Sequence, residues 1–184
     1  SDAKLTLEGQ EYEFPVFSGT ENEMAVDMSA LRAKTKAVAF DPGFGNVGSC
    51  KSAITFIDGE KGILRYRGYP IEELAEKATF SEVCYLLVHG QLPDKKQYAD
   101  WRRALALNSF LREDMLTIFG GFPSTTHPMV TMSAMIASLS AFYPTGAGGD
   151  ELENENAVRL LAKTKTIAAY SYKKLVGEPF MYPK

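Results

Sequence analysis

Two cations near the carboxyl end of the chain carry the strongest local sign of a ligand site. Arg159 and Lys163 are four residues apart in a helix predicted over residues 157–176, so they share one helix face. A like-charged pair at this spacing costs a few tenths of a kcal/mol unless an anion answers it, and a bound phosphate or carboxylate would do so. On the pair alone, two solvated cations beside the acidic run at residues 151–155 are the simpler interpretation.

The other side chains capable of catalysis are not spaced as a site. His89 and His127 are far apart and belong to no Glu-x-x-His pattern, so each is predicted to be structural or to cap a helix. Cys84 falls in an apolar helix and is predicted to be core, whereas Cys50 lies at a loop-to-strand junction with no histidine close in sequence. These patterns predict no catalytic, no cofactor-binding and no metal-binding residue.

A glycine motif near residue 45 is a second candidate for ligand binding. Gly43-Phe-Gly45-Asn-Val-Gly48 matches GxGxxG and follows a short predicted strand at residues 38–40. A dinucleotide fingerprint must open a helix, so that backbone amides face the pyrophosphate, whereas residues 50–56 read as a strand. We therefore interpret the motif as a loop.

Composition describes an ordinary globular protein. The 184 residues are 45% hydrophobic and 23% charged, with a formal net charge of -3, which gives no overall attraction to nucleic acid or anionic lipid. Two cysteines are too few for a disulfide framework and indicate a reducing compartment. No apolar run is long enough for a membrane span, and no signal-peptide pattern is found. We predict a cytoplasmic protein with no nucleic-acid and no membrane partner.

Hydrophobic periodicity separates an initial strand-rich stretch from a helical remainder. Loose alternation predicts hairpins over residues 4–17 and 54–66 and a strand at 38–40. From Pro70 onward the period becomes helical, with helix starts signalled by Ser81, Asp94, Ser109 and either Thr125 or Thr126. We predict a mainly α fold with a small β-rich N-terminal region over residues 1–67, followed by a helical region over residues 68–184.

Several separated motifs, in register along nearly the whole chain, resemble bacterial citrate synthases. The motifs are Phe40-Asp-Pro-Gly-Phe44, the stretch 49–64, Arg67-Gly-Tyr-Pro-Ile71, Thr126-His-Pro-Met129, Val158-Arg-Leu-Leu161 and Gly177-Glu-Pro-Phe-Met-Tyr-Pro183. The match is to the amino-terminal portion of the hexameric type II branch. It implies a truncated citrate synthase-like large domain, whose remaining helices and small domain are absent.

The resemblance also implies an activity. Citrate synthases, which are acyltransferases that convert the acyl group to alkyl on transfer, condense acetyl-CoA with oxaloacetate and water to give citrate and CoA. They use a histidine and an aspartate to form the enol and a second histidine to bind oxaloacetate, and these positions fall after Lys184. Neither His89 nor His127 matches one, so the chain alone is expected to be inactive. Citrate and 2-methylcitrate both remain open as products.

Some members of the hexameric branch bind NADH as an allosteric inhibitor, and the resemblance extends to that site. Tyr143, Arg159 and Lys163 match its residues, and Ser109 stands where a threonine does. Leu107-Asn108 departs from the Arg-His of NADH-sensitive members, which removes charge-assisted bonds to the phosphates. Apart from possible allosteric NADH, no cofactor is expected, and the protein is expected to be a homo-oligomer, dimeric or hexameric. An NADH-binding regulatory module and a purely structural oligomerisation module are the alternatives to the enzyme fragment.

The two ends of the chain suggest a cut. The chain begins Ser1-Asp-Ala3 without a methionine and stops at Lys184, directly after Met181-Tyr-Pro183. A boundary chosen for recombinant expression and a protease that cleaves after lysine are both compatible with that end.

Overall fold

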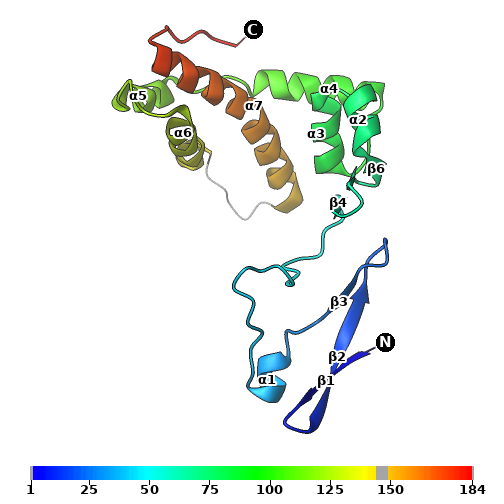
Figure 1. The fold of residues 1–184 in the computed structure, drawn as a ribbon. Helices are drawn as coiled ribbons and strands as arrows, with labels where there is room; N and C mark the ends of the chain where they lie inside the picture. Colours follow the sequence, from blue (N-terminus) through cyan, green and yellow to red (C-terminus); the bar gives the residue numbers. More distant parts are fainter. Residues whose placement is uncertain (1, 144–148, 184) are drawn as a thin grey trace. The chain divides into compact units, whose positions relative to one another are not determined.

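The chain folds as two compact units, Ser1–Ser52 and Ala53–Lys184 (Figure 1). The computed structural model describes residues 2–143 and 149–183, without the side chains of residues 149–151. The sequence-based boundary between residues 67 and 68 marks the change from strands to helices, whereas the compact units divide earlier, between Ser52 and Ala53. As a statement about domains, the boundary at residue 67 stays a prediction.

The first unit is built on a three-stranded antiparallel sheet. Strands β1 (Asp2–Leu7) and β2 (Gln10–Ser18) form the hairpin predicted over residues 4–17, joined at Glu8 and Gly9, which both have positive φ as the hairpin turn requires. Strand β3 (Met24–Val26) pairs with β2, and the short helix α1 (Leu31–Thr35) comes next in the chain. Phe14 and Leu31 are the buried hydrophobic residues of this unit.

One strand prediction in this unit is wrong. Residues 38–40 form no strand, and Val38 and Phe40 are 65% and 89% exposed. Short apolar runs predict strands only where a sheet edge is available to pair with them. The glycine motif at residues 43–48 lies in turns and opens no helix, which confirms its interpretation as a loop.

The second unit begins with a small sheet and continues as helices. Strands β4 (Thr55–Asp58), β5 (Ile63–Tyr66) and β6 (Tyr69–Pro70) form an antiparallel sheet in that order. Arg67 holds this sheet to the helices, because its guanidinium donates to the carbonyl oxygens of Ala53, at 3.3 Å, and of Leu87, at 2.8 Å. This cross-connection links the end of β5 to α3, and β5 and β6 also contact α2. The helices are α2 (Ile71–Lys77), α3 (Phe80–His89), α4 (Lys95–Leu107), α5 (Glu113–Gly121), α6 (Pro128–Phe142) and α7 (Gly149–Val176).

Several helices start at residues other than those predicted. Asp94 caps α4 as predicted, but Thr79, not Ser81, caps α3, and His127, not Thr125 or Thr126, caps α6. Helix α5 begins at Glu113, because the Ser109 hydroxyl donates backward to the Ala106 carbonyl and does not cap the next helix. Each missed start has another polar residue nearby, and only the final backbone path decides whether a side chain meets the free amides; at α5, after Arg112, none does. The loop predicted over residues 145–149 lies almost wholly outside the described residues.

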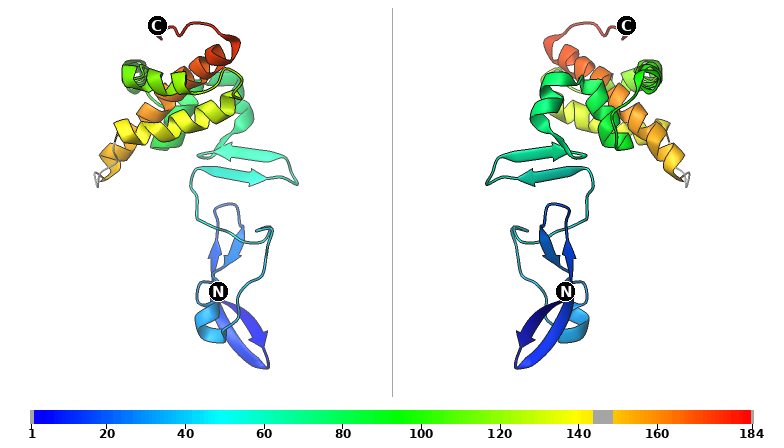
Figure 2. Two further views of the ribbon diagram at one scale, coloured as in Figure 1. Left: turned by 90° about the vertical axis from the view of Figure 1, so that its left-hand side faces the viewer. Right: turned by 90° about the vertical axis from the view of Figure 1, so that its right-hand side faces the viewer.

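Two buried clusters hold the helices together. One joins α5, α6 and α7 through Met115, Phe119, Met135, Leu139, Ile167 and Tyr170, and Figure 2 shows α6 and α7 packed against each other. The other joins α3, α4 and α7 through Cys84, Tyr85, Trp101, Leu105 and Ala162. Helix α7 contributes to both clusters, so it is the element against which the others are positioned. Within the described residues, no helix is both long enough and apolar enough to cross a membrane.

Candidate ligand site around Tyr143

Three of the four predicted site residues meet around one aromatic ring. Tyr143 directly succeeds α6, and Arg159 and Lys163 lie one turn apart on α7. The Arg159 Cζ lies 5.5 Å and the Lys163 Nζ 5.0 Å from the centre of the Tyr143 ring. Both distances are within the range in which a cation is attracted to an aromatic face. The packing of α6 on α7 therefore creates a cluster that the sequence spacing alone could not establish.

Lys163 is a buried cation held by the backbone. Its side chain is 3% exposed, and Nζ donates to the carbonyl oxygens of Asn108, at 2.9 Å, and Phe110, at 2.5 Å. These carbonyls belong to the connection between α4 and α5. Backbone dipoles and the Tyr143 ring thus compensate the desolvation of the ammonium group.

Ser109 sits between the two residues whose carbonyls Lys163 binds. Its Oγ donates to the Ala106 carbonyl at 2.7 Å, and its own carbonyl accepts from Thr166 Oγ1 at 2.7 Å. The serine is therefore next to the cluster, but its hydroxyl proton is used to close the end of α4.

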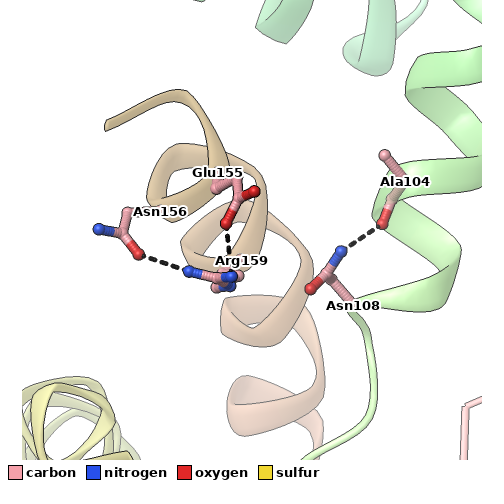
Figure 3. A network of polar contacts seen from close by, with 5 residues as sticks. All are labelled: Ala104, Asn108, Glu155, Asn156 and Arg159. Atoms are coloured by element: carbon pink, nitrogen blue, oxygen red, sulfur yellow. Dashed lines mark hydrogen bonds and ion pairs between the residues drawn. The ribbon is translucent and has the colours of Figure 1, made fainter. Parts of the chain in front are cut away.

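Arg159 is paired within its own helix (Figure 3). Its guanidinium donates to Glu155 Oε2 at 2.6 Å and to Asn156 Oδ1 at 3.0 Å. Unlike Lys163, it remains 29% exposed. The spacing of four residues between Glu155 and Arg159 is the usual one for an ion pair along a helix. The sequence already indicated this pairing, because Glu155 belongs to the acidic run that precedes Arg159.

Leu107 and Asn108, which stand where NADH-sensitive relatives are expected to carry Arg-His, lie at the end of α4. Asn108 Nδ2 donates to the Ala104 carbonyl at 2.9 Å and so closes the last turn of α4, and Leu107 is 70% exposed (Figure 3). Neither side chain offers a cation to this cluster.

The positive charges of Arg159 and Lys163 are thus compensated mainly by groups of the protein itself. Arg159 donates to a carboxylate, and Lys163 donates to two carbonyl oxygens. Arg159 is the cation that an external anion can reach, because an exposed ion pair is weak and exchanges partners easily. The arrangement offers a ligand one accessible guanidinium beside a tyrosine ring.

The two histidines lie at the ends of different helices and have local partners. The His89 ring, at the end of α3, lies 4.2 Å from the Tyr85 ring and 5.5 Å from the Trp101 ring, and desolvation lowers its pKa. His127 Nδ1 accepts from the Met129 amide and caps α6. The structure does not bring them together.

The two cysteines belong to different compact units. Both are free thiols; Cys50 is exposed, and burial raises the pKa of Cys84, which keeps that sulfur protonated. Among the described residues there is no group of three or more histidine, cysteine or carboxylate side chains that could hold a metal ion.

Comparisons with known structures define the fold. Citrate synthase from Thermoplasma acidophilum, solved as a ternary complex with carboxymethyl coenzyme A and oxaloacetate, superposes with a TM-score of 0.75 at 22% identity, over 79% of this chain and 39% of that one. Citrate synthase from Thermotoga maritima superposes with a TM-score of 0.68 at 32% identity, over 79% and 38%. The described structure therefore has the mainly helical fold, with small sheets, of citrate synthases.

Sequence comparisons agree. Residues 43–184 match the family model described as citrate synthase, C-terminal domain. Citrate synthase 1 of Mycobacterium tuberculosis is 47% identical over 186 aligned positions, which cover 98% of this chain and 42% of that protein. The chain belongs to the citrate synthase family, and it spans 42% of the length of this curated relative.

Proposed function

We propose that this chain is the amino-terminal part of an enzyme that condenses acetyl-CoA with oxaloacetate and water to give citrate and CoA. The observation that carries the proposal is the 47% identity to citrate synthase 1 of M. tuberculosis across 98% of the chain. The T. acidophilum relative, whose structure holds a coenzyme A derivative and oxaloacetate, supports the two substrates. The enzyme would thus be an acyltransferase that converts the acyl group to alkyl on transfer.

We place the reacting groups outside these 184 residues. The chain matches 42% of its M. tuberculosis relative, so most of that protein has no counterpart here. Both histidines of the chain already have local partners, Tyr85 and Trp101 for His89 and the Met129 amide for His127. The 184-residue chain would therefore lack activity by itself.

Measurement of CoA release tests this proposal. The chain is incubated with acetyl-CoA and oxaloacetate, and free thiol is followed with a thiol reagent, beside a version extended to the length of its relatives. We expect CoA release only from the extended protein. Release by the 184-residue chain would overturn the placement of the reacting groups, and failure of a folded extended protein with either acyl donor would overturn the activity.

The product is tested in the same assay. Acetyl-CoA leads to citrate, and propionyl-CoA leads to 2-methylcitrate, one methyl group larger. A single methyl group changes binding by about 1–3 kcal/mol in a shaped pocket, which is enough to rank the two donors by kcat/KM. We propose acetyl-CoA as the preferred donor, and a higher kcat/KM for propionyl-CoA would contradict this.

A second function, NADH binding, is favoured by the cluster around Tyr143. We propose Ser109, Tyr143, Arg159 and Lys163 as its allosteric site, with Arg159 as the phosphate-binding cation and the Tyr143 ring as a surface for a base. The support is the approach of both cations to one ring. Lys163 would act by holding the Asn108–Phe110 segment in place, since its ammonium is already bonded there.

Titration with NADH, read from its fluorescence, tests the site. Arg159→Gln should weaken binding about tenfold, because a charge-assisted bond to a phosphate is lost. Arg103→Gln is the matched control, because it removes a cation from α4 that does not belong to the proposed site. This variant should bind NADH as the original chain does. Equal binding by Arg159→Gln and the original chain would refute the site.

We also propose a cytoplasmic homo-oligomer of the hexameric branch. Light scattering of the chain and of the extended protein separates monomer, dimer and hexamer. If the 184-residue chain self-associates without binding NADH, the purely structural oligomerisation module would be the better description of this part. A monomeric extended protein would contradict the assembly proposed here.

A further inference from the structure

A cavity of about 430 Å³ lies between α4 and α7, and its lining on α7 begins at Ala162, next to Lys163 of the Tyr143 cluster. This volume suits a small organic ligand. Its lining comes from the start of α3, from α4, from α7 and from the segment after α7: Ser81, Arg102, Leu105, Ala106, Ser109, Ala162, Lys165, Thr166, Ala169, Tyr170, Met181 and Pro183.

The floor of the cavity is mainly apolar. Leu105, Ala162 and Tyr170 are 8%, 1% and 3% exposed, so they lie at its base and not at its mouth, together with one buried polar residue, Thr166, which is 7% exposed. Met181 adds an exposed, flexible thioether side chain from the segment after α7. Such a surface favours an aromatic or aliphatic group over a bare inorganic ion.

Two cations line the same cavity and are exposed. Arg102 lies on α4 and Lys165 on α7, and within the described part of the chain neither makes an ion pair or a hydrogen bond. The Arg102 guanidinium only approaches the Tyr98 ring, at 5.9 Å. No described lining residue carries a carboxylate. The positive charge of the cavity is therefore uncompensated by its own walls.

Two of the four hydroxyl-bearing residues in the lining already donate their hydroxyl protons within the protein. Ser109 Oγ donates to the Ala106 carbonyl and Thr166 Oγ1 donates to the Ser109 carbonyl, so both protons are already used. Burial, and then the negative charge of Glu113, raise the pKa of Tyr170. The Glu113 carboxylate lies outside the lining and already accepts the Tyr182 hydroxyl. A ligand that compensates the positive charges of Arg102 and Lys165 must therefore carry a negative charge.

We propose that this cavity binds a small organic anion, a phosphate or carboxylate attached to an aromatic or aliphatic body. The anionic group lies between Arg102 and Lys165 at the mouth, and the body covers Leu105 and Tyr170 on the floor. The site uses other cations and another aromatic ring than the proposed NADH site, and Ser109 is the residue that the two sites share. It does not depend on the proposed activity.

Phenyl phosphate is a suitable probe, because it joins a phosphate to a ring of the right size. Calorimetric titration of the 184-residue chain should detect binding that is clearly tighter than that of inorganic phosphate. Arg102→Gln and Lys165→Gln should each weaken the affinity about tenfold, and Arg102→Lys should retain most of it. Added salt should also weaken binding, because both cations are exposed.

The controls decide between this site and general attraction to positive charge. Arg103→Gln removes a cation beside Arg102 that does not line the cavity, and it should leave phenyl phosphate affinity unchanged. No binding of phenyl phosphate, or equal loss in all three glutamine variants, would overturn the proposal. Equal affinity for phenyl phosphate and inorganic phosphate would also overturn it, because the apolar floor would then contribute nothing.

Discussion

At the scale of single residues, Lys163 shows how a charge can be structural. Lysine is rarely buried without a partner, yet this side chain is 3% exposed and ends on two carbonyl oxygens. The bonds join α7 to a segment more than fifty positions earlier, with separations of 55 and 53 residues. The ammonium group therefore acts as a cross-link between the end of α4 and the middle of α7.

Replacing this ammonium group should destabilise the fold. In Lys163→Met the carbonyls of Asn108 and Phe110 lose their donor in a partly buried setting, at a cost of about 1–3 kcal/mol. Urea unfolding followed by circular dichroism measures the change. Lys165→Met, two residues away and exposed, is the control and should stay within about 0.5 kcal/mol. Equal stability of the two variants would mean that water can replace the lysine.

At the scale of elements, the start of α3 is fixed by a reciprocal cap. Thr79 Oγ1 accepts from the Glu82 amide at 3.3 Å, and Glu82 Oε2 accepts from the Thr79 amide at 2.7 Å. The Thr79 amide and then its hydroxyl stabilise the carboxylate, so the pKa of Glu82 is lowered. The cap thus combines two hydrogen bonds with a negative charge at the positive end of a helix.

Loss of the threonine should cost about 1 kcal/mol. Thr79→Ala removes the acceptor for the Glu82 amide and one donor to its carboxylate, which is the usual cost of an emptied N-cap. Thr125→Ala, an exposed threonine that precedes α6, should change stability by less than about 0.5 kcal/mol. The midpoints of urea unfolding for the two variants give the comparison. Similar midpoints would show that Ser81 can replace the cap.

The same cap predicts a pH dependence. The pKa of Glu82 is lower in the folded chain than the value of about 4.3 expected when unfolded, so its contribution is present above that value and is lost as the pH falls through the folded pKa. Glu82→Gln should therefore lose less stability than the original chain between pH 6 and pH 3. Parallel pH profiles for the two proteins would contradict the assigned cause.

At the scale of the whole molecule, the two compact units differ in how much they bury. Both large hydrophobic clusters consist of residues within Ala53–Lys184, whereas Phe14 and Leu31 are the buried hydrophobic side chains of Ser1–Ser52. Burial of apolar area provides most of the stabilising free energy of a domain. The helical unit is therefore the part expected to be stable alone.

Removing the first unit tests this expectation. A chain that begins at Ala53 should unfold cooperatively at nearly the same urea concentration as residues 1–184, because both buried clusters are intact. Ellipticity at the helical band reports the transition. A broad transition, or one at much lower urea, would show that residues 1–52 stabilise the helices.

Local patterns in the sequence were sufficient for the start of α4, for the two predicted hairpins and for the family. Helix α4 begins directly after its predicted Asp94 cap, because capping depends on residues only three or four positions apart. The prediction of a strand at residues 38–40 was wrong because a strand needs a pairing partner from elsewhere in the chain, which local patterns do not reveal. The motifs that indicated citrate synthase were likewise read directly from residue order.

Tertiary structure alone decided what the candidate residues touch. Spacing placed Arg159 and Lys163 on one helix face, but their partners differ because Glu155 lies one turn away on α7, whereas Asn108 and Phe110 arrive from the α4–α5 connection. The cavity between Arg102 and Lys165 had no sequence signal, since its cations belong to helices that meet only through packing around Leu105 and Ala162. Burial and charge compensation are properties of the packed chain, because they depend on segments far apart in sequence.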